Sequence, residues 1–219
     1  MAQLDVQTAS IREIKTSDDI ALGEIARLHV AQLSPGALAE MGEAFVREVG
    51  YRLLIRSGAL QVAALMDDGH VRGYIAFTDR AGDYQGQAFL RHPLRVMLTT
   101  LRALLQRPAR FRAVFAMLQD MRTHLPNQGT DAGSTAEIAA IVVDPGYLRS
   151  SSSAGSRHPG DLLLDHAIGV LRNRGCKILC ARINSDRRPA LLLYARRGAD
   201  HLDYLRRGEP MVQVMLKLG

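Results

Sequence analysis

Glycine, serine and arginine residues gather where a long apolar segment of the sequence gives way to an amphipathic one. The apolar segment AEIAAIVV spans residues 136–143, and DPGYLRSSSSAGSRHPGD follows it directly. A helix that begins after such a loop can bind pyrophosphate, because its first N–H groups are unsatisfied and glycine lets the backbone approach a phosphate closely. The alternative is a flexible linker with an ordinary helix cap, since neither a Walker-type loop nor a dinucleotide-binding glycine fingerprint occurs. The candidate contacts are Arg149, Gly155, Arg157, Gly160 and Asp161.

Two separated motifs are similar to motifs of the GNAT superfamily of N-acetyltransferases. Residues 143–149, VDPGYLR, are similar to the start of the loop with which that family binds acetyl-CoA, and Gly160 is similar to its end. A second family motif is matched in order by Asn184, Ala190, Leu193, Tyr194 and Gly198. The resemblance extends over residues 10–218. It implies an α/β (α+β) fold with a mixed sheet of about seven strands flanked by helices, and acetyl-CoA as cosubstrate without a metal.

The resemblance also implies catalytic roles for two residues. In that family a tyrosine at the position of Tyr194 protonates the departing CoA sulfur, and a glutamate at the position of Glu137 is the general base in some branches. A phenol suits the first role because its pKa near 10 keeps it protonated at neutral pH. The alternatives are a packed aromatic side chain for Tyr194, and for Glu137 a salt-bridged carboxylate at a strand end. The implied reaction is direct transfer of an acetyl group to the primary amine of a small acceptor, with a base or water taking the proton.

The pantetheine arm of CoA carries two amides, which need hydrogen-bond partners. A strand that separates from its neighbour leaves peptide groups free, so the backbone of Ile141, Val142 and Val143 could pair with the arm as a strand would. The side chain of Asn184 could bond the same arm. Asn184 could equally cap the helix that follows it.

Hydrophobic periodicity predicts the elements that must position these residues. Period-two patterns and apolar runs predict strands at 10–15, 60–66, 70–78, 136–143, 177–183, 201–206 and 211–218. Spacings of three and four residues predict helices at 19–33, 38–53, 94–106, 109–122, 161–174 and 189–197. Asp67-Asp68-Gly69 predicts a hairpin turn, and the run at 136–143 is typical of a strand covered on both faces. A single domain over residues 1–219 is expected, with a helical insert at 84–125 between the third and fourth strands.

Composition excludes several classes of protein. The chain has 219 residues, of which 47% are apolar and 23% charged, so it is neither disordered nor collagen-like. The polar N-terminus and the lack of a stretch of about 18 apolar residues predict a cytoplasmic location without a signal peptide or membrane span. Cys176 and Cys180 would lie ~13 Å apart along a strand, too far for a disulfide, and are expected to be buried thiols. His29, His166 and His201 lack metal-ligand spacing and are expected to be structural or exposed.

Positive charge is concentrated in the insert. Residues 84–125 contain seven arginines and one acid, which accounts for the whole net charge of +6. One interpretation is a lid that attracts an anionic acceptor; another is a helical hairpin that extends the core or joins two chains in a homodimer. A third is a non-catalytic module with a decayed CoA site, whose insert docks on an anionic membrane surface, a nucleic acid or a protein. Few aromatic residues lie among the arginines, so nucleic acid is the least expected partner.

Overall fold

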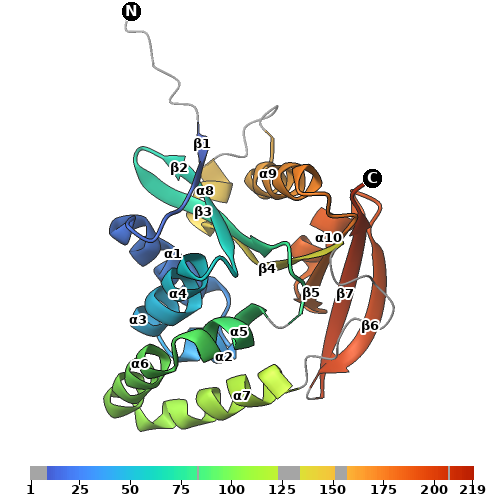
Figure 1. Cartoon of the computed structure of the whole chain (residues 1–219). Coiled ribbons are helices and arrows are strands. Elements are labelled where there is room, and N and C mark those ends of the chain that lie inside the picture. The colour runs from blue at the N-terminus through green and yellow to red at the C-terminus, as the bar shows by residue number, and fades with distance from the viewer. Residues whose placement is uncertain (1–8, 83, 123–133, 151–156, 207) are drawn as a thin grey trace, which may run out of the picture.

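The computed structural model describes residues 9–82, 84–122, 134–150, 157–206 and 208–219. Its centre is a seven-stranded sheet with the order β1-β2-β3-β4-β5-β7-β6 (Figure 1). Neighbouring strands are antiparallel except β4 and β5, which are parallel. The mixed α/β sheet predicted from the sequence is thereby confirmed. The strands are β1 (Ser10–Glu13), β2 (Gln61–Asp67), β3 (His70–Thr78), β4 (Thr135–Val143), β5 (Ile178–Asn184), β6 (Asp200–Arg206) and β7 (Glu209–Lys217).

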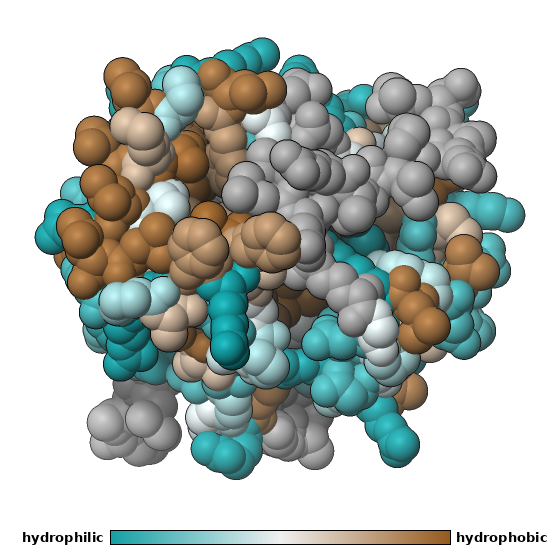
Figure 2. Space-filling view, turned by 90° about the horizontal axis from the view of Figure 1, so that it is seen from below, coloured by the Kyte–Doolittle hydropathy of each residue, from teal (hydrophilic) through white to brown (hydrophobic). Residues whose placement is uncertain are grey.

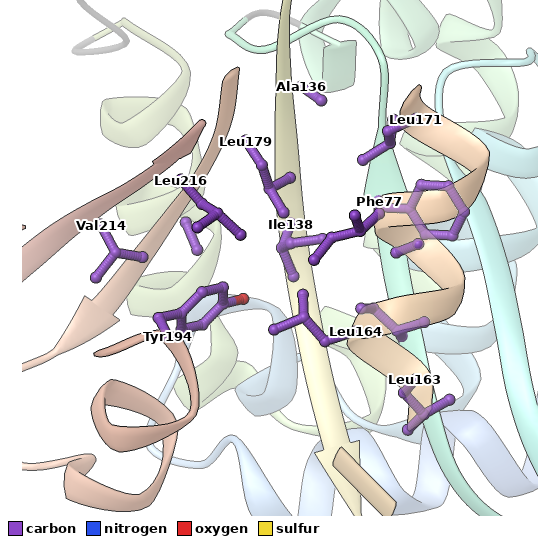
Figure 3. Close-up of a cluster of buried hydrophobic side chains, with 14 of the residues drawn as sticks. Phe77, Ala136, Ile138, Leu163, Leu164, Leu171, Leu179, Tyr194, Val214 and Leu216 are labelled. Carbon is purple, nitrogen blue, oxygen red and sulfur yellow. The ribbon is translucent and has the colours of Figure 1, made fainter. Parts of the chain in front are cut away.

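Helices cover both faces of the sheet. On one face, α9 and α10 pack against β2–β5 and β7 through apolar side chains that include Leu164, Leu171 and Tyr194 (Figure 3). On the other, α1, η1, α4 and α5 pack against β2, β3 and β4 through a second apolar cluster. The helices are α1 (Asp19–Gln32), α2 (Ala37–Glu40), α3 (Glu43–Phe45), η1 (Val46–Arg52, a π-helix), α4 (Leu53–Arg56), α5 (Tyr84–Arg91), α6 (Pro93–Gln106), η2 (Pro108–Arg110, a 3₁₀ turn), α7 (Phe111–Arg122), α8 (Pro145–Ser150), α9 (Pro159–Asn173) and α10 (Arg188–Ala195).

The single helix predicted over residues 38–53 is wrong. The segment is interrupted at Gly42, whose φ of 88° is incompatible with a right-handed helix. Helix α2 ends before this point, and from Glu43 to Arg56 the segment continues without a gap through α3, the π-helical η1 and α4. Two short helices, α5 and α8, were not expected from the sequence. The insert between β3 and β4 contributes α5, η2 and the predicted pair α6 and α7, which lie at the end of the molecule away from β1 (Figure 1).

The turn predicted at residues 67–69 is present between β2 and β3, where the backbone has positive φ angles. Asp68 and Gly69 have φ of 51° and 76° between β2 and β3, as the predicted hairpin turn requires.

Cys176 and Cys180 are both free and buried, and burial raises the pKa of each thiol. Within the described ranges, no helix combines the length and the apolar character that crossing a membrane would require.

A bulge in β4 divides that strand into two unlike halves. Ala76 and Phe77 of β3 pair with Ala140 and Ile138, so Ala139 is an extra residue in β4. The strand pairs with β5 only from Thr135 to Ile138. The prediction of a strand covered on both faces holds for this buried first half, whereas Ala139 is exposed and most of the following residues are half-buried. A bulge bends its strand, which accounts for the separation of β4 from β5 beyond this point.

Candidate active site

The divergence of β4 and β5 opens a cleft of about 430 Å³. Its walls are the second half of β4, the end of β5, the start of α9 and the buried side of α10. The predicted contacts Ile141, Val142, Val143 and Asn184 all line it. Because β4 and β5 share no backbone pair beyond Ile138 and Ala181 in the described chain, their facing peptide groups are available to a ligand. The cleft can therefore accept an extended molecule that hydrogen-bonds as a strand does.

Tyr194 places a phenol in the wall of this cleft. Its helix, α10, has Pro189 in its first turn and ends before Gly198, whose φ is 70°. The side chain is 1% exposed, and its hydroxyl is directed from α10 towards β4 near Ile138 (Figure 3). Among the described residues the Tyr194 hydroxyl has no hydrogen-bond partner. Burial raises the pKa of this phenol well above 10, so the group stays protonated at neutral pH. An unsatisfied buried hydroxyl is uncommon and can donate to a ligand.

Asn184 ends β5 with its side chain in the cleft wall. The alternative prediction, that Asn184 caps the next helix, is wrong. The N-cap of α10 is Arg187, whose own side chain makes no capping hydrogen bond. The Asn184 carbonyl accepts a hydrogen bond from the Arg187 N–H at 2.9 Å, which turns the chain into α10. Asn184 therefore shapes the start of α10 through its backbone carbonyl, and the residue lines the cleft.

The described members of the predicted phosphate-binding set lie on α8, just before α9 and in the first turn of α9. Gly160 lines the cleft, and its N–H donates to Nδ1 of His158, the N-cap of α9, at 3.1 Å. Arg149 is exposed on α8, and Arg157 pairs with Asp165 at 2.9 Å. Gly155 lies outside the described residues.

Asp161 has a structural partner. It pairs with Arg197, which also bonds Asp165 at 2.8 Å and so ties the end of α10 to the first turns of α9. Burial lowers the pKa of the Arg197 guanidinium, but its hydrogen bonds to the two carboxylates outweigh this effect and raise it. Asp161 therefore holds α9 and α10 together beside the cleft.

A second cavity, of about 290 Å³, lies on the other side of the point where β4 and β5 separate. It is lined mainly by α1, α2, α5, β4 and β5, with Arg206 from β6 and Met117 from α7. The two cavities share five lining residues: Leu33, Gly36, Ile138, Ala139 and Arg182. A molecule in the cleft and a molecule in the second cavity would thus meet at the bulge in β4.

Glu137 faces the second cavity from the paired half of β4. It is 6% exposed, forms an ion pair with Arg182 of β5, and accepts a hydrogen bond from the Gly82 N–H at 3.2 Å. Burial lowers the pKa of Arg182, but the carboxylate of Glu137, together with Tyr204 and Tyr84, outweighs this effect and raises it. Glu137 is therefore salt-bridged, as one of the two sequence interpretations predicted, and it also lines the cavity next to the cleft, where its role as a base stays a prediction.

His29 also lines the second cavity, a position that the sequence did not indicate. Its Nδ1 lies 2.7 Å from the Tyr51 hydroxyl and 3.0 Å from the Tyr74 hydroxyl, and Tyr51 donates to Tyr74 at 2.8 Å. Burial lowers the pKa of His29 to about 4, so the ring is neutral at pH 7. Its partners are 22 and 45 residues away in the chain, which no local pattern could reveal. Across the described residues, no three His, Cys, Asp or Glu side chains form a group that could hold a metal ion.

No protein-family model and no curated protein sequence matches this chain. Solved structures do match its fold. A protein from Desulfovibrio desulfuricans assigned to the GNAT family of acetyltransferases is 16% identical and has a TM-score of 0.56, covering 97% of this chain and 100% of its own. YncA of Salmonella typhimurium, solved with acetyl-CoA, is 15% identical with a TM-score of 0.55, covering 97% and 95%.

An N-acetyltransferase from Staphylococcus aureus Mu50 is 15% identical and has a TM-score of 0.55, covering 97% of this chain and 99% of its own. In each case the similarity covers nearly the whole of this chain. Because the sequence identity is low, the similarity shows a shared fold and nothing beyond it. The parallel pair β4 and β5, which separates beyond the bulge at Ala139, lies in the middle of the sheet of this chain. The chain has the fold of the GNAT acetyltransferases.

Proposed function

We propose that this protein is an N-acyltransferase that moves the acetyl group of acetyl-CoA directly to the primary amine of a small acceptor. The observation that carries the proposal is the meeting of two cavities at Ala139, with the unpartnered Tyr194 hydroxyl in the wall of the first. One cavity would hold the donor and the other the acceptor. The fold similarity supports acetyl transfer as the type of reaction.

The cleft suits the pantetheine arm of acetyl-CoA. The arm's amides would pair with the free backbone edge at Ile141 and Val143, and the Asn184 side chain would bond the same arm. The pyrophosphate would lie at the start of α9, where Gly160 supplies an N–H once His158 releases it. Arg149 and Arg157 are the cations nearest in sequence to that helix start and would pair with the phosphates. The bound donor supplies an acetyl thioester.

Two side chains would move the protons. The amine nitrogen forms a bond to the acetyl carbon as the carbon–sulfur bond breaks, so the amine must lose a proton and the sulfur must gain one. Tyr194 would donate to the sulfur, and burial keeps the phenol protonated until that moment. Burial also disfavours a bare thiolate, which strengthens the hydrogen bond from Tyr194. Glu137, directly or through a water molecule, would accept the proton of the amine in the second cavity.

Arginine side chains suggest an acceptor with an anionic group. Arg182 and Arg206 line the second cavity, and Arg206 comes from β6 at the far edge of the sheet. Of the described insert residues, Tyr84, Gln85, Phe89 and Met117 line this cavity, while the insert arginines lie elsewhere. An acceptor carboxylate or phosphate would therefore meet Arg206 and not the insert.

Thermal unfolding with acetyl-CoA tests the donor site. Acetyl-CoA at about 100 times its dissociation constant should raise the free energy of unfolding by about 2.7 kcal/mol. Asn184→Ala should weaken binding about fivefold through the loss of one hydrogen bond, whereas Asn173→Ala, on the exposed side of α9, should not. No shift of the unfolding temperature at millimolar acetyl-CoA would reject the proposal.

A panel of primary amines, assayed by the release of CoA thiol, tests the reaction. Amines that carry a carboxylate or phosphate should give the highest kcat/KM. Arg206→Gln should raise KM for those amines alone, and the exposed Arg196→Gln should have no effect. A protein that binds acetyl-CoA and releases no thiol with any amine would be a binding module and not an enzyme.

A further inference from the structure

The insert exposes a large apolar surface, which we call the insert face. It consists of the side chains of Leu90, Leu94, Met97, Leu98, Leu101, Leu105, Phe111 and Phe115. Each is more than half exposed, from 51% for Leu101 to 79% for Leu90. Figure 2, which views the molecule from the side of α6 and α7, shows apolar side chains gathered over this region. These eight residues are two thirds of the large apolar side chains that the described chain exposes.

The helices of the insert are oriented with their small residues inward. Among the side chains whose burial is described, the buried residue is Ala103 on α6 and Ala113 on α7, and both belong to one apolar cluster with Met41, Phe45 and Val49. Leu94, Leu98, Leu101 and Leu105 follow one another at three- and four-residue spacing on the outer side of α6. A surface helix ordinarily buries its apolar stripe. Since the core here does not use this stripe, the insert face is suited to a partner.

The charged residues that the insert itself carries next to the insert face are arginines, while Glu40 and Glu43 of the neighbouring helices line a pocket with Arg107 and Arg110. Residues 84–117 include six arginines and no aspartate or glutamate. Arg95 bonds Glu48 at 3.1 Å, and Arg110 bonds the Ala103 carbonyl at 3.1 Å. The four other arginines of this segment are exposed, namely Arg91, Arg102, Arg107 and Arg112.

We propose that the insert face docks on an anionic membrane surface. Amphipathic helices that join a broad apolar face to arginines bind at the boundary between lipid headgroups and acyl chains. The leucines and phenylalanines would enter that boundary, and the four exposed arginines would contact anionic headgroups. A second copy of the chain fits less well, because a two-fold interface would bring like arginine clusters together. This inference stands on the surface alone and does not depend on acyl transfer.

Vesicle co-sedimentation of the full chain tests the proposal. Vesicles of phosphatidylglycerol and phosphatidylcholine in equal parts should bind the protein, and vesicles of phosphatidylcholine alone should bind it much more weakly. The double variant Leu98→Ser/Leu101→Ser should bind at least about tenfold more weakly, because two apolar side chains no longer enter the lipid. Arg102→Gln/Arg112→Gln should lose about tenfold as well. All four sites are exposed, so thermal unfolding of both variants should match that of the natural chain.

Matched variants elsewhere on the surface serve as controls. Leu202→Ser/Leu205→Ser changes two exposed leucines of β6, and Arg56→Gln/Arg196→Gln removes two exposed arginines outside the insert. Both should bind anionic vesicles as the natural chain does. Equal binding by the control and the insert-face variants would overturn the proposal. A dimer in sedimentation equilibrium that Leu98→Ser/Leu101→Ser dissociates, with no vesicle binding by the natural chain, would also overturn it.

Discussion

Ile138 of β4 and Ala181 of β5 form the last residue pair that joins these two parallel strands. Immediately after it, the extra residue Ala139 bends β4 away from β5. Both cavities reach this point, and Ala139 lines each of them. The pair therefore marks where the continuous sheet ends and where donor and acceptor would meet.

Enlarging Ala139 should block the meeting point of the two cavities. We expect Ala139→Leu to lower kcat/KM by at least about tenfold, because the larger side chain occupies space next to the reacting atoms. The residue is exposed, so the free energy of unfolding should stay within about 0.5 kcal/mol of the natural value. Thiol release and denaturant unfolding measure the two effects. Ala195→Leu, at an exposed position of α10, is the control. Unchanged kcat/KM in Ala139→Leu would place the reaction elsewhere.

Removing the Tyr194 hydroxyl should separate catalysis from stability. We expect Tyr194→Phe to lower kcat about 10²-fold while the affinity for acetyl-CoA stays the same, since the phenol acts only on the leaving sulfur. Stability should not fall, because this hydroxyl has no partner among the described residues. Tyr51→Phe, which removes a hydroxyl bonded to His29 and Tyr74, should cost about 1 kcal/mol. A Tyr194→Phe enzyme with full kcat would show that another group protonates the sulfur.

Glu137→Gln distinguishes a general base from a structural ion pair. An amide cannot take the proton of the amine, so a base role predicts a fall in kcat of about 10²-fold or more and the loss of the acidic limb of the pH–rate profile. Glu24→Gln is the control. It breaks the pair between Glu24 and His70, and Glu24 lines neither the cleft nor the second cavity, so the pH–rate profile should stay intact. If Glu137→Gln keeps the acidic limb and only lowers the unfolding temperature, Glu137 serves Arg182 alone.

Acid should destabilise the protein through His29. Burial lowers the pKa of His29 from 6.5 to about 4, so between these values the unfolded chain binds more protons than the folded one. The free energy of unfolding should therefore fall as the pH decreases from 6.5 to 4, by about 3 kcal/mol from this residue. The difference between the natural chain and His29→Gln, measured by urea unfolding across this pH range, isolates the contribution. Parallel curves for the two proteins would show that His29 remains protonatable in the fold.

Local signals in the sequence determined most of the elements. The Asp68-Gly69 turn needs positive φ at both residues, and such turns depend on little beyond their own backbone. The amphipathic pattern of α9 and its end at Gly175 are likewise readable from neighbours in the chain. Residues 143–149 and Tyr194 were connected with acetyl-CoA binding by their resemblance to two family motifs, and such motifs can be recognised from neighbouring residues in the chain.

The tertiary structure alone decided how these elements combine at the site. Periodicity shows that α6 has an apolar face, but it cannot show that this face points outward, because only packing of Ala103 against the core orients the helix. Glu137 and Arg182 are 45 residues apart, and His29 meets Tyr51 and Tyr74 from another helix and a strand. These contacts follow from strand register and helix packing, which depend on the whole chain at once. Local pattern therefore indicated residues that line the cleft, whereas the second cavity and its charges exist only in the folded protein.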